Sequence, residues 1–399
     1  MEAKKFYGDR LRSARIYRGL TLTELAKQTG ISKQSLSLYE NDNNTPPLEN
    51  VLSLATHLDF PMDFFWQKDF CRTNTDTTYF RSQATANKKD RLAQKEKLEY
   101  VIKIYEVLTQ YIDFRDINLP SIPFVGSTDP LDDDSFSVMQ EIEQIADTVR
   151  NYWNLGRGPI ENLQYKLEEN GLIVTGFTLN ESKIDAFSQR IFSNDNCNIF
   201  VIALGLGSKP QERLNLDMAH ELGHILLHPW GENLDVLSKT EFNGREKQAN
   251  MFASALLLPK DTFGNEIAMY PTDLDYYKHL KKKWHMSIQA MIYRTQQLSI
   301  ITPNQYTYLM KQVSKNGWRT KEPGDSPGSL NETIFQGAID ILFENNYFDA
   351  ASFMKELKKY GITLHSTDIE DLLQLRKGTL KVEPKLEDKK VVPIVQLRK

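Results

Sequence analysis

The sequence predicts an α+β protein that is mainly helical and is divided into several domains. Its 399 residues exceed what one compact core usually holds, so we expect two to four folding units. Short helical patterns separated by glycine and proline fill residues 6–66, whereas short runs rich in β-branched residues, interpreted as strands, begin at residue 172. With 40% hydrophobic and 26% charged residues, the composition is typical of globular domains.

Charge and cysteine content narrow the classes of function. The net charge of −4 argues against a protein covered with nucleic-acid-binding surface, but residues 1–33 hold eight basic and three acidic side chains, the local excess that a small DNA-docking face needs. Cys71 and Cys197 lie far apart, which excludes a thiolate zinc site and fits a reducing cytosol. Because we find no signal-peptide core and no apolar run of membrane length, we expect a cytoplasmic protein without membrane contact.

Residues 1–68 are predicted to form an N-terminal bundle of five short helices. The residues that begin or end these helices are Gly19, Gly30, Ser32, Pro46, Pro47 and Pro61. The tight turn between the second helix and the third, over residues 33–40, is typical of a helix-turn-helix.

Residues 69–136 are interpreted as a helical connector. Residues 88–115 are charged and carry an amphipathic stripe of Leu98, Ile102, Tyr105 and Leu108. Prolines and the acidic stretch 129–134 then indicate a flexible junction.

Residues 137–322 mix helical and strand patterns and predict a domain with a small sheet. The predicted helices cover residues 141–154, 159–170, 213–228, 245–258, 274–283 and 287–298, and the predicted strands cover residues 172–175, 189–192 and 198–204. The run PGDSPGS at residues 323–329 indicates a linker, and residues 323–399 are expected to hold three helices and a charged tail.

The strongest chemical signal is HELGH at residues 220–224. A spacing of four places His220 and His224 on one helix face, where both can bind one zinc ion. Glu221 then faces the water that a catalytic zinc activates, as a general base must.

A catalytic zinc site needs a third protein ligand and an open position. Glu246 is the preferred candidate, because it opens a predicted helix whose same face carries small alanines that allow close packing. A surface carboxylate stabilised by a helix N-terminus is the alternative for Glu246, and Glu241 is the second choice of ligand. A straight helix carries His228 past the metal, so we expect it beside a ligand or at the helix end.

The sequence gives weaker indications of the oxyanion stabiliser and of the substrate-binding segment. Arg190 and Tyr293 are candidates for stabilising a developing oxyanion, although surface or core roles are commoner for both. The predicted strand 189–192 could bind an extended peptide by edge pairing.

HELGHILLH at residues 220–228 and EKQANMFASALLLP at residues 246–259 resemble the ImmA/IrrE metallopeptidases. Similar blocks occur in order at residues 157–160, 185–188, 213–219, 282–294 and 317–319, so the resemblance covers residues 137–322. It implies a zincin-like domain of the gluzincin type with one Zn²⁺ per chain, His220, His224 and Glu246 as ligands and Glu221 as base. Family members include proteases that cut repressor proteins. Gln248 stands where relatives often have a second acid, which removes a competing ligand.

Residues 6–66 resemble the Xre/lambda-repressor-like helix-turn-helix family through LTELAKQTGISKQSLSLYEN and PPLENVLSLATHL. The resemblance implies a recognition helix over residues 33–39 in the major groove of an operator, with the protein bound as a homodimer on two half-sites. The DNA-contacting residues that it implies are Lys33 and Gln34 at base edges, Leu38 at a thymine methyl group, and Ser32, Ser35, Asn41 and Asn43 at phosphates.

Two positions in this region need a structural interpretation. Arg15 and Glu40 match a buried salt bridge of the family, so we do not expect Arg15 to contact DNA. Leu22 replaces a glutamine that grips phosphate in many relatives, which weakens the expected affinity.

Two functions are compatible with these motifs. The first is a DNA-binding transcription regulator with a zinc endopeptidase domain that cleaves a repressor or another regulatory protein. The second is a regulator or antitoxin-like protein whose metallopeptidase-like domain senses a ligand or binds a partner without turnover. Intact His220, Glu221, His224 and Glu246 favour the first.

Overall fold

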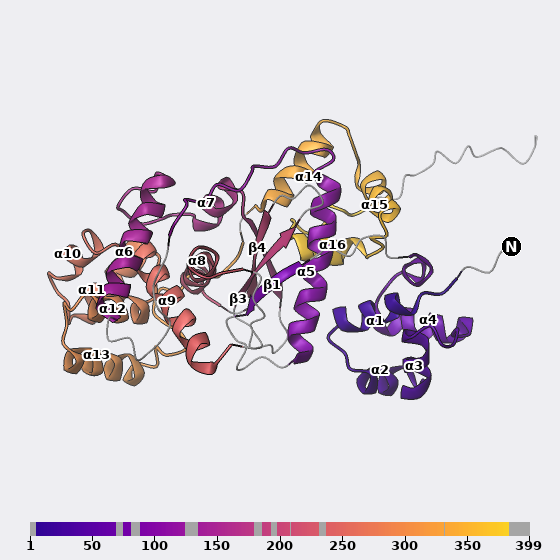
Figure 1. The fold of residues 1–399 in the computed structure, drawn as a ribbon, viewed down its shortest axis with the longest axis horizontal. Coiled ribbons are helices and arrows are strands. Elements are labelled where there is room, and N and C mark those ends of the chain that lie inside the picture. The colour runs from indigo at the N-terminus through magenta and orange to yellow at the C-terminus, as the bar shows by residue number, and fades with distance from the viewer. Residues whose placement is uncertain are drawn as a thin grey trace, which may run out of the picture.

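The structure is a computed structural model that describes residues 5–68, 75–80, 88–123, 135–178, 186–192, 198–207, 209–230, 237–330 and 332–382. Helices surround a single four-stranded sheet, which confirms the predicted α+β, mainly helical fold (Figure 1). None of the helices in these ranges is long and apolar enough to cross a membrane.

The five predicted N-terminal helices are all present. They are α1 (Gly8–Tyr17), α2 (Leu22–Thr29), α3 (Lys33–Glu40), α4 (Leu48–Leu58) and a 3₁₀ helix (Met62–Trp66). Thr21 and Glu24 form a capping box at the start of α2, and Gly30 ends that helix with a φ of 73°. Ser32 caps α3 by accepting a hydrogen bond from the Ser35 amide. The local signals in the sequence therefore define the helix-turn-helix.

The sheet contains one strand that the sequence analysis missed. Its strands are β1 (Thr75–Phe80), β2 (Ile173–Thr178), β3 (Ala186–Phe192) and β4 (Asn198–Leu206), in the order β1-β3-β4-β2. β4 pairs parallel with β2 and antiparallel with β3, which also pairs antiparallel with β1. Because β3 lies between two strands, the expectation that residues 189–192 bind a peptide by edge pairing is wrong.

Helices cover both faces of the sheet. α5 (Lys88–Leu108) and α16 (Ser366–Leu373) pack on one face, and α8 (Gln211–Leu227) packs on the other (Figure 1). Strand alternation sends Val201 and Ala203 of β4 into the first core and Ile202 and Leu204 into the second. α5 is more than the predicted connector, because it forms the layer between the sheet and α1.

The remaining helices extend these two layers. Those on the α8 side are α6 (Ser135–Tyr152), α7 (Leu163–Glu169), α9 (Lys239–Leu257), α10 (Phe263–Ile267), α11 (Leu274–Trp284), α12 (Ile288–Gln297) and α13 (Pro303–Lys315). The C-terminal region adds α14 (Ile334–Glu344) and α15 (Ala350–Lys359) before α16, as the three predicted helices. α10 and α13 were not predicted. Most of the predicted flexible junction, residues 124–134, and the end of the charged tail, residues 383–399, lie outside the described residues.

The predicted linker at residues 323–329 is anchored to the fold. Lys281, which is 1% exposed, pairs with Glu322 at 3.0 Å and also with Asp325. Glu322 accepts hydrogen bonds from the backbone amides of Ile288 and Gln289 as well, so it also caps the start of α12. The glycines and prolines of this segment indicate turns, but buried charge pairing holds the turns in place.

The helix-turn-helix docks on the C-terminal region through two arginines. Arg10 is buried, lies 3.9 Å from the centre of the Phe64 ring and donates a hydrogen bond to the Gly361 carbonyl. Arg18 forms a bidentate pair with Asp368 of α16 at 2.8 and 2.9 Å. Arg10 and Arg18, both part of the N-terminal excess of basic side chains, are therefore engaged within the protein.

One buried acid makes the stability of the fold depend on pH. Glu168 at the end of α7 accepts hydrogen bonds from the Ile334 amide at 3.3 Å and from Gln164 at 3.4 Å. Burial raises the pKa of Glu168 from 4.5 to about 8, although both hydrogen bonds oppose this shift. Folding therefore takes up a proton at this residue between those two pH values.

We predict that Glu168→Gln changes how stability varies with pH. The stabilisation from a protonated Glu168 is complete below pH 4.5 and is lost as pH rises through about 8. The free energy of unfolding of the wild type should thus fall towards pH 8.5 by up to roughly 1.4 kcal/mol per pH unit from this group. When melting temperatures are measured from pH 5 to 9, the melting temperature of the variant relative to that of the wild type should increase with pH. A constant difference over that range would contradict the prediction.

Candidate metal centre and nucleic-acid interface

Helix α8 presents both histidines of the HELGH motif on one buried face. His220 is 0% exposed and His224 is 1% exposed. Their Nε2 atoms lie 3.0 Å apart, as expected from one helical turn of separation. The apolar side chains that bury this helix are Leu214, Met218, Leu222 and Ile225.

Glu246 of α9 completes a group of three potential metal ligands. One carboxylate oxygen of Glu246 lies 3.2 Å from His224 Nε2 and the other lies 3.4 Å from His220 Nε2. One ligand atom from each of the three residues falls within 4.8 Å of the others. Two imidazoles and a carboxylate form the donor set of a His₂Glu zinc site.

Close packing of α8 on α9 brings Glu246 to the histidines. A Cβ atom placed on Gly223 would lie 3.1 Å from the Ala249 Cα atom and 3.1 Å from the Phe252 ring. A glycine opposite an alanine allows the two helix axes to approach at this point. Glu246 is one turn before Ala249, so the contact places its carboxylate beside the ligands on α8.

Hydrogen bonds set the tautomers of both histidines. His220 Nδ1 lies 3.1 Å from Asn250 Oδ1, and the Asn250 side-chain amide donates to the Glu246 carbonyl at 2.8 Å. This arrangement makes Nδ1 of His220 the donor and leaves a lone pair on Nε2.

His224 follows the same rule through a longer chain. Its Nδ1 lies 2.9 Å from His228 Nδ1, and His228 Nε2 lies 3.1 Å from Gln248 Oε1. Gln248 Oε1 can only accept, so His228 carries its proton on Nε2 and accepts from His224 through Nδ1. Both ligand histidines thus direct an Nε2 lone pair at the same point. Two facing lone pairs and a carboxylate fit a divalent cation.

The charge state of His228 agrees with this assignment of protons. Burial lowers the pKa of His228 well below its ordinary value of 6.5, and His224 adds to this effect, so His228 is neutral. Burial by itself raises the pKa of Glu246, but the adjacent imidazoles of His220 and His224 outweigh burial and lower that pKa to about 2. Without a metal this contact needs a proton on Nε2, and a bound cation would take the place of that proton. Glu246 is therefore a carboxylate at neutral pH.

The other proposed ligands occupy different positions. Glu241 pairs with Arg245 at 3.0 Å and is 37% exposed. His228, a further ligand candidate one turn beyond His224, instead hydrogen-bonds to His224, as expected for a residue beside the ligands. Helix α9 begins at Lys239, because Ser238 caps it by accepting from the Glu241 amide. Glu246 thus lies inside the helix, and the alternative that a helix N-terminus stabilises it is wrong. The pattern Ser-x-x-Glu at residues 238–241 marks the true start of this helix, and the sequence analysis missed it.

Glu221 is held by a residue to which the sequence analysis assigned no role. Ser188 of β3 donates a hydrogen bond from its hydroxyl to Glu221 Oε2 at 2.7 Å, and both residues are fully buried. Alternation along β3 points Ser188 at α8. The sequence block at residues 185–188 contained this serine, but only the sheet reveals its partner.

A cleft of about 750 Å³ is lined by one of the three ligands, Glu246. Glu246 and Asn250 line it on one side, and α12, α13 and residues 318–325 line the other. Tyr293 lies on its wall, whereas the Arg190 guanidinium lies 5.9 Å from the centre of the Trp230 ring. Of the two oxyanion candidates, Tyr293 is the one that lines the same cleft as Glu246.

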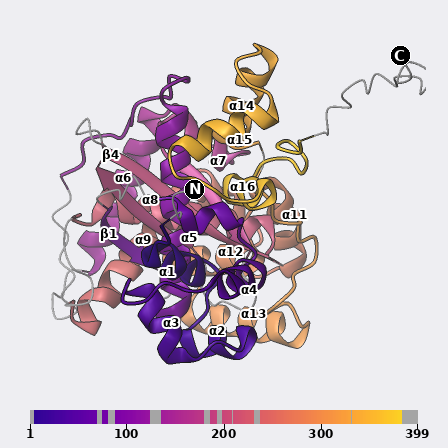
Figure 2. The same ribbon diagram turned by 90° about the vertical axis from the view of Figure 1, so that its right-hand side faces the viewer.

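The proposed DNA-contacting residues lie in α3 or close to its two ends. The exposed residues are Ser32, Lys33, Gln34, Leu38, Asn41 and Asn43. Ser35 is half-buried, and its hydroxyl lies 2.9 Å from that of Ser32. Helices α2 and α3 lie at the lower edge of the helix-turn-helix in both views (Figures 1 and 2), and Lys89 of α5 pairs with Glu24 of α2 at 3.0 Å.

A salt bridge inside this domain confirms a prediction. Arg15 binds Glu40 through two hydrogen bonds of 2.6 and 2.9 Å, and a third bond reaches the Leu20 carbonyl. Neither side chain is more than 13% exposed. Arg15 therefore ties α1 to α3.

Comparison with known proteins identifies two domains in this chain. Residues 175–296 match the family model Peptidase_M78, described as the IrrE N-terminal-like domain, and residues 11–65 match the helix-turn-helix model HTH_3. A curated relative is the uncharacterized HTH-type transcriptional regulator YobD of Bacillus subtilis (strain 168), 38% identical over 58 residues. That match covers 14% of this chain and 52% of the relative, so the chain spans about half the length of the curated protein that it matches.

We predict that Gly223→Val separates α8 from α9. The added methyl groups must displace Ala249 or Phe252, since a Cβ alone already makes contacts of 3.1 Å. Overpacking should lower the free energy of unfolding by about 1–3 kcal/mol. Zinc affinity, measured by competition with a chromogenic chelator, should fall roughly ten- to a hundredfold, as when supporting groups of a metal site are lost.

Gly158→Val is the matched control, because nothing lies within 4 Å of a Cβ placed there. Wild-type zinc affinity in Gly223→Val would contradict the dependence of the site on this helix contact.

Proposed function

We propose that this chain, which joins a DNA-binding helix-turn-helix domain to an IrrE N-terminal-like domain, is a transcription regulator with zinc endopeptidase activity. Its proposed substrate is a repressor or another regulatory protein. The observation that carries the proposal is the convergence of two Nε2 lone pairs and a carboxylate beside a buried Glu221, next to an open cleft. Structural zinc sites have four protein ligands, whereas catalytic sites have three and an open position. Among the described residues, His220, His224 and Glu246 form the one group of potential ligands, and that group has three members.

Each residue of the site has a role in peptide hydrolysis. His220, His224 and Glu246 would hold one Zn²⁺. The bound zinc would polarise the peptide carbonyl and make water more acidic. Glu221 takes the proton from the attacking water and passes it to the departing amine, so the peptide bond breaks without free hydroxide. Ser188 is a positioning residue, because its hydrogen bond orients the Glu221 carboxylate.

The cleft gives the proposed substrate a place to bind. It lies along α12 and α13, where Tyr293 and Tyr306 offer aromatic surface to an extended chain. Tyr293 is 40% exposed, so its hydroxyl is accessible to a peptide oxyanion. A cleft lined by Glu246 and by aromatic side chains supports an endopeptidase over a domain that only binds metal.

A second candidate function is regulation without turnover. In that case the same ligands would bind metal, and the domain would sense a ligand or hold a partner. The hydrogen bond from Ser188 to Glu221 favours turnover, because neither residue is needed to bind metal.

The wider organisation is proposed on the same basis. We divide the chain into a DNA-binding domain at residues 1–68, a connector at 69–136, a peptidase domain at 137–322 and a C-terminal region at 323–399. We propose a cytoplasmic homodimer that binds a double-stranded operator through Lys33 and Gln34 of α3.

We predict that Glu221→Gln keeps zinc and loses cleavage. Glutamine preserves shape but cannot accept a proton from water, so the rate of proteolysis should fall by about a hundredfold or more. Cellular protein fragments from wild type and variant, compared by mass spectrometry of new N-termini, would also name the substrate. Glu241→Gln is the control on α9. Cleavage that survives in zinc-loaded Glu221→Gln would refute the assigned base.

We predict that Lys33→Ala with Gln34→Ala removes sequence-selective DNA binding. Each lost base contact should cost about 1–3 kcal/mol of discrimination, while phosphate contacts keep weak non-specific binding. Selection from a random duplex library followed by fluorescence anisotropy measures both. Lys311→Ala with Gln312→Ala on α13 removes the same residue pair far along the chain and should leave selectivity unchanged. If the α3 variant kept its sequence-selective DNA binding, α3 would not be the recognition helix.

A further inference from the structure

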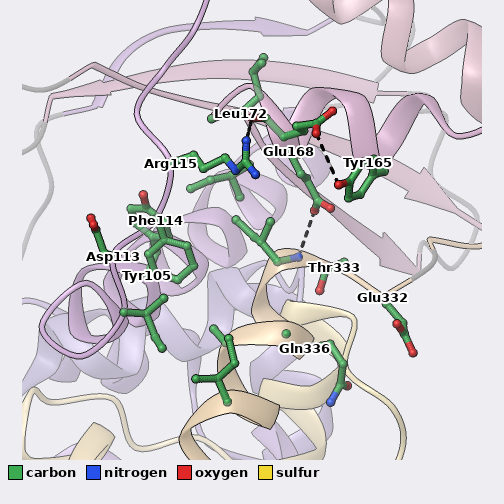
Figure 3. Close-up of a pocket in the computed structure, with 18 of the residues that line it drawn as sticks. Tyr105, Asp113, Phe114, Arg115, Tyr165, Glu168, Leu172, Glu332, Thr333 and Gln336 are labelled. Carbon is green, nitrogen blue, oxygen red and sulfur yellow. Dashed lines mark hydrogen bonds between the residues drawn. The ribbon is translucent and has the colours of Figure 1, made fainter. Parts of the chain in front are cut away.

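A second pocket lies where three regions of the chain meet, apart from the metal ligands. We call it the junction pocket; its volume is about 350 Å³. The segment after α5, the end of α7 with the start of β2, and the first turns of α14 surround it (Figure 3). This volume is in the range of small-molecule sites in proteins. None of the ligands on α8 and α9 lines it.

Aromatic side chains form much of its wall. The Tyr105 and Phe114 rings lie 4.7 Å apart, centre to centre, on one side of the junction pocket. Tyr165 of α7 lies on another side and is 52% exposed (Figure 3). Aromatic faces carry partial negative charge and attract cations as well as apolar groups.

Glu168 places a carboxyl group inside the pocket. It is 8% exposed, and among the described residues no basic side chain forms an ion pair with it. Its two hydrogen bonds come from the neutral Ile334 amide and Gln164. Burial raises the pKa of this carboxyl group to about 8, so without a partner it is largely protonated at neutral pH. A cation placed beside this carboxyl group would favour its ionised form.

The other charged groups of the junction pocket are mainly acidic. Arg115 is its single basic residue, exposed, and its guanidinium contacts the Glu169 carbonyl at 3.5 Å. The four further acids are Asp113, Glu169, Glu332 and Asp340. Glu169 pairs with Lys166, and Asp340 pairs with Arg376, so rim charges are partly neutralised while Glu168 is not.

We propose that the junction pocket binds a small organic cation, an amine with an apolar body. Its ammonium group pairs with Glu168, and its apolar body packs between Tyr165 and the pair Tyr105 and Phe114. On binding, the Glu168 carboxyl group gives its proton to solvent and becomes the carboxylate of an ion pair. The site does not depend on metal binding or on proteolysis at the metal centre.

The position of this pocket links two parts of the fold. Glu168 holds the start of α14, where Thr333 donates to the Leu373 carbonyl at the end of α16. Asp368 of α16 in turn holds Arg18 of the helix-turn-helix. A ligand in the junction pocket would therefore contact the start of α14, which these hydrogen bonds connect through α16 to the helix-turn-helix.

Isothermal titration calorimetry on the full chain tests the proposal. The probes are phenethylamine, tryptamine and cyclohexylamine, with 2-phenylethanol as the neutral counterpart of the first. We expect saturable binding of at least one amine and roughly tenfold or more weaker binding of the alcohol. The affinity for the amine should rise from pH 6 to 8.5, because Glu168 ionises over that range. No binding of any amine, or equal binding of amine and alcohol, would overturn the proposal.

Three variants localise the binding. Glu168→Gln should lose roughly tenfold or more in affinity for the amine, together with its pH dependence. Tyr165→Ala should weaken binding and leaves the fold intact because the side chain is exposed, so the test survives if Glu168→Gln fails to fold. Glu161→Gln, an exposed acid just before α7 and outside the pocket, should bind like the wild type. Unchanged affinity in both pocket variants, or an equal loss in the control, would place the amine elsewhere.

Discussion

The close contact of α8 with α9 at Gly223 and Ala249 is the constraint on which the metal centre depends. It allows a carboxylate from one helix to meet two imidazoles from the other, at 3.2 and 3.4 Å. The same pair of helices supplies Asn250, His228 and Gln248, which hold the ring protons away from the metal side. A single glycine thus controls both the ligands and the groups that orient them, because a larger side chain would push the two helices apart.

The sheet carries the rest of the site and joins it to the other layer. Ser188 faces α8 and orients Glu221, while Phe187 and Ile191 of the same strand face α5. Side chains of a strand alternate between faces, so one strand serves the proposed catalytic site and the core under the DNA-binding domain. The junction pocket lies at the edge of this second layer, where α14 leaves the sheet.

Basic residues of the N-terminal domain fall into two groups, those that bind other parts of the protein and those that remain exposed. Arg10, Arg15 and Arg18 are engaged in carbonyl and carboxylate contacts within the protein, and they fix α1 against α3, α15 and α16. Lys33 and Gln34 on α3 remain exposed. Net charge over a segment does not distinguish these uses, since a guanidinium serves carboxylates and phosphates equally well. The surface available for DNA is consequently narrower than the composition of residues 1–33 indicates.

Features that depend on neighbouring residues could be predicted from the sequence. Helical spacing in HELGH, the caps at Ser32 and Gly30, and the strands around residues 173, 189 and 201 depend on neighbours a few residues away, and these elements were predicted. Contacts between segments far apart in the chain could not be predicted from the sequence. The pairing of β1, the hydrogen bond from Ser188 to Glu221, the anchoring of residues 323–329 on Lys281 and the exposure of Glu168 to a pocket arise from packing. The sequence by itself therefore determined which groups carry the proposed chemistry, because that follows from residue type and helical period. Only the tertiary structure decided how those groups are oriented and what surrounds them, because burial and hydrogen-bond partners come from residues far apart in the chain.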